Sequence, residues 1–364
     1  MADHPAKQDD LVTSAMSHWG PRFVSNGVAL TDFEEITGRL QSWDDWCSAW
    51  SERAADHERM GRLALAEGHA ISAGEHLERA GVYYHFAKFL FVHDLAQMKV
   101  AHMKAVACRS DALPYLRPAG ERIAIPYEGK TLFGILRKPA GIARPPVVVM
   151  VMGLDSAKEE TAAYEQPFLA RGIATLAFDG PGQGEGEYDL AIRGDYEQPV
   201  KAVFDWLASR GDLDTSRAAL WGVSMGGYYA ARAAAFETRA KACIALAGPY
   251  DLADCWDSMP QLTRTTFRVR AKCETEAEAK RHAATLSLKG LAQQIACPLY
   301  IVSGKLDRVI PWQHAERLAR EASGEVVLNL IEDGNHIANN RPYRWRSQSA
   351  DWLADKLGAK PASN

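Results

Sequence analysis

Apolar and polar positions follow different periods in two parts of the chain, which meet near residue 117. In the first part, apolar side chains recur every three or four residues, the period of an amphipathic helix. In the second part, short β-branched runs alternate with amphipathic stretches, a pattern typical of successive strands and helices. Pro114 and Pro118 mark the junction, because a proline disfavours helix in the residue before it. We therefore expect a helical domain at residues 1–117 and a second domain at 118–364.

The first part contains three clear helical stretches with short connections, which predict an antiparallel all-helical domain. They span residues 42–68, 71–92 and 95–108. Upstream of them, Thr31 and Glu34 have the spacing of a capping box, which predicts the start of a helix.

Aromatic residues in this part recur at helical spacing. Trp43, Trp46 and Trp50 share one helical face, and we expect them to belong to the core. Tyr83 and Tyr84 begin a second aromatic cluster. For these two residues we consider both core packing and a place in the lining of a substrate pocket where the two domains meet.

The second part predicts an α/β fold. Residues 146–152 are almost wholly apolar, as expected of a strand that is buried on both faces. A hairpin is expected around Glu128 and Gly129, and amphipathic stretches separate the later strands. Those later strands are expected at residues 173–178, 217–221, 241–246, 299–303 and 326–331. Alternation of this kind predicts a mostly parallel sheet with helices on both faces.

Composition narrows the class of protein. The 364 residues are 47 % hydrophobic and 24 % charged, as in a soluble globular protein with one large domain and an accessory domain. The 42 basic and 46 acidic residues leave no cationic excess, which disfavours nucleic-acid binding. Neither a membrane-spanning run nor a signal-peptide pattern is present, so no membrane association is expected. Six scattered cysteines without a CxxC pair favour reduced thiols in a cytoplasmic protein.

The segment from Gly222 to Gly226 carries the sharpest chemical signal, because Gly-Val-Ser-Met-Gly matches G-x-S-x-G between an expected strand and helix. Such a turn strains the serine backbone, and its glycines let the strand and the helix approach each other. We interpret Ser224 as a nucleophile. The alternative is a glycine-rich turn whose serine only caps a helix.

A nucleophilic serine needs a histidine as its base, and three histidines follow Ser224. His336 lies in an expected loop after the last strand, at the edge of the sheet where Ser224 should also stand. His282 and His314 are expected within helices, so we favour His336.

The remaining parts of the site follow from chain order. Asp307 comes after the strand expected at residues 299–303 and is the candidate for the acid that orients the histidine, with Asp333 as the weaker alternative. The amides of Met225 and Leu154 are the candidate oxyanion donors, one after the nucleophile and one after the first buried strand. Because HExxH and CxxC motifs are absent, neither a metal nor a cofactor is expected.

In its motifs the chain resembles the α/β-hydrolase superfamily over about residues 120–360, with nucleophile, acid and histidine in the same order. Three further segments resemble a branch with an N-terminal helical domain, which includes 2,6-dihydroxypseudooxynicotine hydrolase and fungal enzymes that shorten polyketide chains. These segments are residues 153–160, 179–185 and 247–252. The resemblance implies an α/β-hydrolase fold, retro-Claisen cleavage of a C–C bond beside a ketone in a small molecule, and a homodimer.

The resemblance also implies an acidic residue in the segment after the strand that ends near residue 246. Asp251, Asp254 and Asp257 stand there, and Trp256 is a candidate for the pocket lining. One of these acids, or His336, would protonate the carbon leaving group.

Other functions stay open at this level. Nothing in the residues separates C–C cleavage from carboxylesterase, thioesterase or amidase activity on a small acyl substrate. A non-catalytic binding protein that keeps the serine turn, and an interaction scaffold built on the helical domain, are the remaining alternatives.

Overall fold

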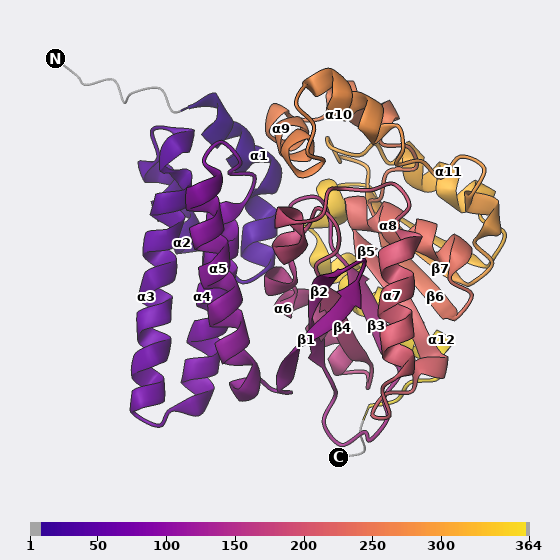
Figure 1. Ribbon diagram of the computed structural model, residues 1–364, viewed down its shortest axis with the longest axis horizontal. Helices are drawn as coiled ribbons and strands as arrows, with labels where there is room; N and C mark the ends of the chain where they lie inside the picture. Colours follow the sequence, from indigo (N-terminus) through magenta and orange to yellow (C-terminus); the bar gives the residue numbers. More distant parts are fainter. Residues whose placement is uncertain (1–8, 362–364) are drawn as a thin grey trace. The chain divides into compact units, whose positions relative to one another are not determined.

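The computed structural model describes residues 9–361. They divide into two compact units, with the boundary between Leu116 and Arg117. Each unit has its own secondary structure, helical in the first and mixed in the second (Figure 1). Among the described residues, no helix combines the length and the apolar character needed to cross a membrane.

The helical unit is built around an aromatic core. Its helices are α1 (Asp10–Ser25), α2 (Leu30–Arg39), α3 (Trp46–Ala66), α4 (Ala70–Lys88) and α5 (Leu95–Ala112), of which α3, α4 and α5 pack side by side (Figure 1). Trp43, Trp46 and Trp50 are buried as expected. Phe23 on α1 stacks against Phe86 on α4, with ring centroids 3.9 Å apart. Aromatic packing therefore joins the first helix to the later ones.

Two helices in this unit precede the three that the sequence predicted, and one predicted cap is wrong. α1 continues through Pro21, which the sequence pattern would treat as a helix breaker. The buried side chains of Trp19 and Phe23 anchor it on both sides of the proline. α2 begins one residue before Thr31, with no side-chain cap, so Thr31 and Glu34 form no capping box.

The second unit contains an eight-stranded sheet in the order β1-β2-β4-β3-β5-β6-β7-β8. Its strands are β1 (Gly120–Tyr127), β2 (Lys130–Arg137), β3 (Val147–Val151), β4 (Ala174–Phe178), β5 (Ala218–Val223), β6 (Ala240–Leu246), β7 (Leu299–Gly304) and β8 (Val326–Ile331). β2 is antiparallel to both β1 and β4, and the other neighbouring pairs are parallel. The predicted α/β class and mostly parallel sheet are confirmed.

Alternate residues of β3 enter two separate cores. Val147, Val149 and Val151 pack in the core beneath α7 (Glu197–Ala208), α8 (Met225–Phe236) and α11 (Gln313–Glu321). Val148 and Met150 pack on the opposite face. The helices of that face are α6 (Ala162–Leu169) and α12 (Arg346–Leu357). The apolar run that predicted a strand buried on both faces is thereby explained.

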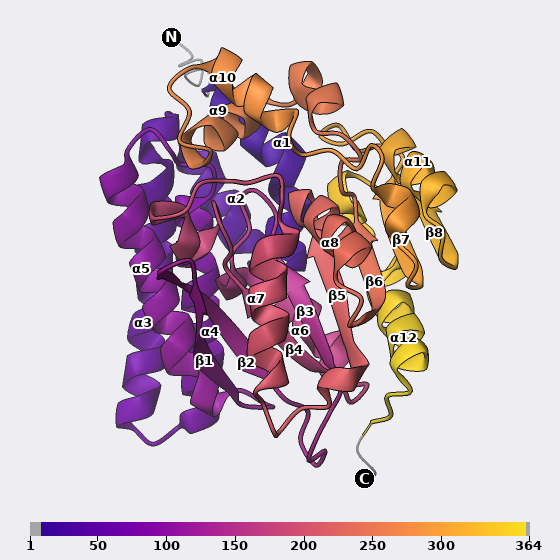
Figure 2. The same ribbon diagram turned by 45° about the vertical axis from the view of Figure 1, so that its right-hand side comes forward.

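The long excursion between β6 and β7 is helical. After the short 3-10 turn Ala253–Ser258 it forms α9 (Gln261–Arg270) and α10 (Glu276–Ala283). In both views these helices lie at one end of the sheet (Figures 1 and 2). Since the excursion leaves the sheet at the end of β6, next to the loops that carry the expected site, its first residues can contribute to that site.

Candidate active site

Ser224 stands alone between the end of β5 and the start of α8, in a left-handed backbone conformation with φ 56° and ψ −126°. Its backbone N–H donates to the carbonyl of Leu246, at 2.8 Å. A Cβ atom on Gly222 would come within 1.9 Å of the carbonyl oxygen of Gly226, so the turn requires glycine at that position. The strain presents the hydroxyl at the end of the sheet, as a nucleophile requires.

The structure brings Ser224, His336 and Asp307 into one hydrogen-bonded chain. His336 Nε2 lies 2.9 Å from Ser224 Oγ, and His336 Nδ1 lies 2.7 Å from Asp307 Oδ2. The other carboxylate oxygen of Asp307 accepts the backbone N–H groups of Val309 and Ile310, at 2.8 and 2.9 Å. Because a carboxylate only accepts, His336 carries its proton on Nδ1, and Nε2 is free to take the serine proton.

Backbone strain gathers around this chain of residues. Ile337 and Ala338, directly after His336, have φ values of 62° and 50°. Ala247, directly after β6, has φ 45°. Left-handed conformations of such residues cost about 1–3 kcal/mol each and persist where the surrounding structure imposes them, often at functional sites. The strained positions support the assignment of this end of the sheet as the site.

The alternatives for base and acid are occupied elsewhere. His314 Nδ1 accepts a backbone N–H from the segment after β6 at 3.0 Å, and His282 Nε2 donates to a backbone carbonyl at 2.8 Å. Asp333 forms an ion pair with Arg341 at 2.7 Å, which lowers the pKa of Asp333. None of the three contacts Ser224 in the part of the chain that the structure describes.

The two candidate oxyanion amides flank the nucleophile. Met225 is the first residue of α8, and Leu154 belongs to the segment 152–158 after β3, here called the oxyanion loop. Neither N–H donates to a protein acceptor within residues 9–361. A Cβ atom on Gly153 would lie 3.2 Å from the Cβ of Ser224, so the loop backbone passes directly beside the serine. The Leu154 amide is therefore placed to meet a developing oxyanion.

Three side chains from other segments hold the oxyanion loop. Gln183 Nε2 donates to the carbonyl of Met152 at 2.7 Å, and Arg270 Nη1 donates to the carbonyl of Leu154. At the far end, Asp179 accepts the backbone N–H of the loop's last residue at 2.9 Å. Sequence analysis missed these roles. Gln183 and Asp179 lie in a visible glycine-rich motif, but nothing in the sequence around Arg270 indicates its contact.

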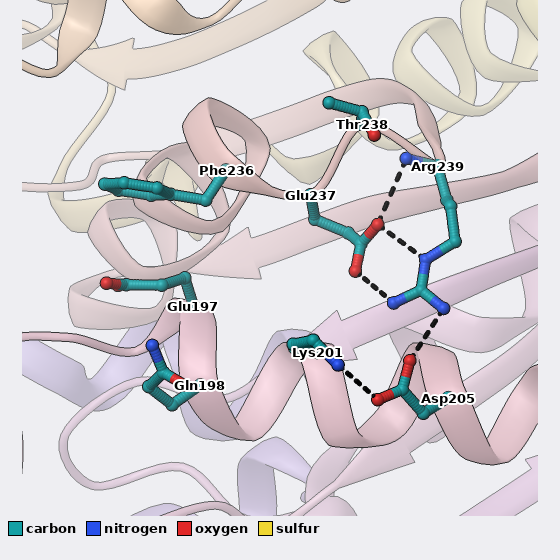
Figure 3. Close-up of a pocket in the computed structure, with 8 residues that line it drawn as sticks. All are labelled: Glu197, Gln198, Lys201, Asp205, Phe236, Glu237, Thr238 and Arg239. Carbon is teal, nitrogen blue, oxygen red and sulfur yellow. Dashed lines mark hydrogen bonds and ion pairs between the residues drawn. The ribbon is translucent and has the colours of Figure 1, made fainter.

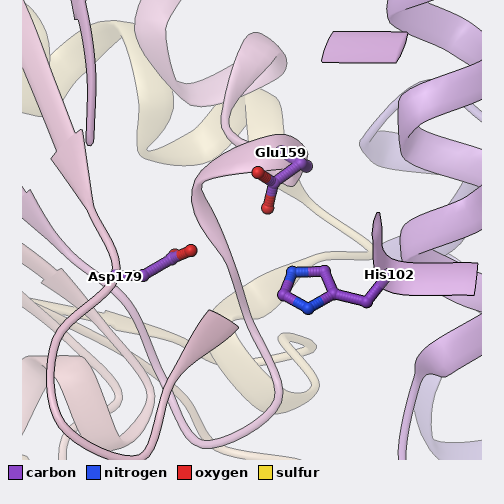
Figure 4. A group of neighbouring side chains, drawn as sticks. All are labelled: His102, Glu159 and Asp179. Carbon is purple, nitrogen blue, oxygen red and sulfur yellow. The ribbon is translucent and has the colours of Figure 1, made fainter. Parts of the chain in front are cut away.

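A buried charge cluster adjoins this loop. Lys158 Nζ lies 2.6 Å from Glu159, 2.7 Å from Asp179 and 2.6 Å from Glu185. Figure 4 shows Glu159 and Asp179 on two loops of the second unit; the third residue drawn, His102, belongs to α5 of the helical unit. Burial raises the pKa of Asp179 to about 6, although Lys158 lowers it. Burial alone would lower the pKa of Lys158, but the three carboxylates raise it, so the amine stays charged.

The three aspartates expected to serve as proton donors are tied to lysines instead. Burial alone would raise the pKa of Asp251, but its bonds to Lys289, at 2.7 Å, and to Ser287 lower that pKa. Asp254 lies 3.9 Å from the same lysine. Asp257 is largely exposed and pairs with Lys280 at 2.8 Å. No described contact joins any of the three to the serine or the histidine.

The aromatic candidates are buried. Trp256 packs edge-on against Phe267 of α9, with ring centroids 5.5 Å apart. The hydroxyl of Tyr83 donates to Asp32 at 2.6 Å, and the hydroxyl of Tyr84 to a glutamate of α3 at 3.0 Å. Both tyrosine hydroxyls therefore have partners within the helical unit.

A separate cavity of about 530 Å³ lies beside α7, at the end of α8 remote from Ser224 (Figure 3). Its charged side chains neutralise one another: Asp205 pairs with Lys201 at 2.6 Å and with Arg239 at 2.8 Å. It holds no residue of the candidate site.

Comparison with known proteins shows the family of the chain. Residues 160–360 match the model of the prolyl oligopeptidase family. The chain is 36 % identical to 2,6-dihydropseudooxynicotine hydrolase of Paenarthrobacter nicotinovorans, over 94 % of this chain and 93 % of that protein. It is 33 % identical to 20-hydroxy-prefusarin hydrolase of Gibberella moniliformis, over 62 % of this chain and 58 % of that protein.

A solved structure is similar over almost the whole chain. The crystal structure of 2,6-dihydroxy-pseudo-oxynicotine hydrolase superposes with a TM-score of 0.86 at 34 % identity, covering 93 % of this chain and 95 % of that one. The chain is thus a hydrolase of the α/β-hydrolase fold, and it belongs to the prolyl oligopeptidase family.

Proposed function

We propose that this protein is a serine hydrolase that cleaves a C–C bond beside a ketone in a small aromatic molecule. The observation that carries the proposal is the continuous chain of hydrogen bonds from Asp307 through His336 to Ser224. The whole-length relative named as a hydrolase of 2,6-dihydropseudooxynicotine supports the choice of substrate class.

In the proposed mechanism, Ser224 Oγ attacks the ketone carbon while His336 Nε2 takes the hydroxyl proton. The amides of Met225 and Leu154 stabilise the oxyanion. Collapse of the adduct breaks the C–C bond, and the electron pair leaves with the departing carbon as an enolate. His336 returns the proton to that carbon, because Asp251, Asp254 and Asp257 lie beside lysines and have no described contact with Ser224 or His336. Water activated by His336 then hydrolyses the acyl-enzyme and releases the acid.

The test compares the protein with Ser224→Ala on aryl 1,3-diketones and on p-nitrophenyl acetate and butyrate. We expect acid release from the diketones with the parent enzyme and none with the variant. Turnover of the esters alone would contradict C–C cleavage and assign an esterase of the same fold. Equal behaviour of parent and variant, together with no labelling of Ser224 by a fluorophosphonate, would contradict nucleophilic catalysis altogether.

We also propose a cytoplasmic homodimer. The dimer rests on the resemblance to the branch with a helical domain, and the location is supported by six unpaired cysteines. Light scattering of the purified protein tests the dimer, and a mass of 40 kDa would contradict it.

A further inference from the structure

One face of α9 presents polar side chains to the interior. Thr263, Thr266 and Arg270 stand at positions i, i+3 and i+7, so they form a single stripe along the helix. Their exposed fractions are 6 %, 0 % and 2 %. A stripe at this spacing is ordinarily apolar when a helix packs on a core.

Several polar atoms of this stripe lack a hydrogen-bond partner in the part of the chain that the structure describes. Within residues 9–361, Thr263 Oγ1, Thr266 Oγ1 and Arg270 Nε have no hydrogen-bond partner. Threonine hydroxyls in a helix commonly donate to the carbonyl four residues earlier, and these two do not. A buried polar atom without a partner loses its hydration and gains no hydrogen bond in return, which destabilises the fold. Packing alone would therefore favour valine at both threonine positions.

Arg270 connects the stripe to the reacting centre. Its Nη1 donates to the carbonyl of Leu154, in the oxyanion loop, and its Nη2 lies 3.2 Å from Glu187. From the rise of an α-helix, Thr266 and Thr263 stand about 6 and about 10 Å further along α9. The stripe therefore begins beside the oxyanion loop and extends away from it.

An adjacent, apolar face of α9 attaches the helix to the core of the second unit. Phe267 and Ala271 belong to the apolar core, and Phe267 packs against Trp256. α9 is thus fixed by apolar contacts, and its polar stripe is not needed to hold it in place.

We propose that Thr263, Thr266 and Arg270 bind oxygen substituents of the substrate, and that the substrate is a polyoxygenated ketone. Arg270 binds the enolate oxygen of the leaving group, which gains negative charge when the adjacent C–C bond is cleaved. The two threonines bond to neutral hydroxyl or keto oxygens further from the reacting carbonyl. This inference rests on the proposed function and names the substrate class of that same site.

The first experiment measures equilibrium binding to Ser224→Ala, which does not turn over. The probes are an aryl 1,3-diketone with ring hydroxyls and the same compound without them. We expect the hydroxylated compound to bind about tenfold more tightly, and Thr266→Val to remove that advantage, since one hydrogen bond to a buried group has about this effect. Thr265→Val, a half-buried threonine of α9 outside the stripe, is the matched control and should change neither affinity.

The second experiment separates the role of Arg270 in the reaction from its support of the loop. Arg270→Met should lower kcat for the diketone about a hundredfold and kcat for p-nitrophenyl acetate about tenfold, because only the diketone releases an enolate. Arg270→Lys should restore part of the diketone rate. Arg268→Met, at a partly exposed position of α9 outside the stripe, is the control. Equal loss on both substrates would reduce Arg270 to a positioning residue and contradict its proposed contact with the enolate.

The two proposals fail in distinguishable ways. If a fluorophosphonate labels Ser224 but both diketones bind alike, or neither binds, the stripe does not recognise substrate oxygens and the inference is wrong while the serine hydrolase stands. If Ser224 is not labelled and Ser224→Ala changes no activity, the proposed function itself is wrong.

Discussion

At the scale of single residues, the site depends on which atoms have partners. Asp307 has both oxygens engaged, one by His336 and one by two backbone N–H groups, so the carboxylate and the imidazole hold a single orientation. Asp333, only three residues from the histidine, faces Arg341 instead. Hydrogen bonding therefore favours Asp307 as the acid, although Asp333 is closer to the histidine in the sequence.

This difference can be tested with a matched pair of substitutions. Asp307→Asn should lower kcat by about 10⁴, because an amide can hold the imidazole in the wrong tautomer. Asp333→Asn should leave kcat within about twofold, since its ion pair is exposed. Steady-state kinetics, measured on whichever of the diketones or p-nitrophenyl esters the parent enzyme turns over best, compares the two variants. A large loss with Asp333→Asn and a small one with Asp307→Asn would reverse the assignment.

Gly153 offers a second test at this scale. A Cβ atom there would come 2.8 Å from the carbonyl oxygen of Val223, so Gly153→Ala must move the oxyanion loop. We expect kcat to fall about a hundredfold, the usual effect of losing one oxyanion donor. Gly211→Ala is the control, because a Cβ atom at Gly211 meets nothing within 4 Å. Unchanged kcat in Gly153→Ala would show that the Leu154 amide is not a donor.

At the scale of elements, the oxyanion loop is positioned by segments distant in the sequence. Asp179 and Gln183 hold it from the loop after β4, and Arg270 holds it from α9. Lys158, the last residue of the loop, lies among three carboxylates from two loops. The position of the candidate oxyanion donor, the Leu154 amide, thus depends on a network of buried polar contacts. Loss of one partner would weaken the whole network.

Removal of the lysine should therefore be costly. Lys158→Met leaves the buried carboxylates of Glu159 and Asp179, and the partly buried one of Glu185, without their ammonium. We expect the free energy of unfolding to fall by about 3–5 kcal/mol. Lys201→Met, which breaks the exposed ion pair with Asp205 beside the cavity in Figure 3, should cost less than about 1 kcal/mol. Urea denaturation of both variants measures the difference, and equal losses would contradict the importance of the buried cluster.

At the scale of the whole molecule, the candidate catalytic residues lie at one end of the sheet, which has a hydrophobic core on each face. The loops after β3, β5, β7 and β8 carry Leu154, Ser224, Asp307 and His336, respectively. Parallel strands end at a common edge, so residues separated by 182 positions along the chain, from 154 to 336, meet there. Each core helps to hold that edge, because alternate residues of β3 belong to different cores.

The cysteines give a prediction for the molecule as a whole. Burial raises the pKa of Cys47 and Cys297 to about 11 and of Cys108 and Cys255 to about 12, so these thiols stay protonated at neutral pH. Thiol titration of the native protein should be slow, with Cys273, which is only partly buried, among the first to react. In denaturant without reductant all six should react. Fewer than six would reveal a disulfide.

Much of the fold was predictable because its signals are local. The apolar run at β3 and the glycines around Ser224 depend on neighbouring residues, and both correctly indicated the strand and the turn. The helical period likewise located α3, α4 and α5. α1 was not predicted, because Pro21 opposes a helix locally and the packing of Phe23 against Phe86 overrides that signal. For α2 the sequence indicated a helix start at Thr31, close to the observed start, but the capping box does not form.

The sequence by itself determined the mostly parallel sheet, and it predicts the two-part organisation and the order of nucleophile, acid and histidine, because periodicity and chain order can be read directly along the chain. Only the tertiary structure decided that Arg270 holds Leu154 and that lysines neutralise Asp251 and Asp257. These contacts join residues far apart in the chain. Burial and pairing in three dimensions determine whether such a charge serves structure or chemistry.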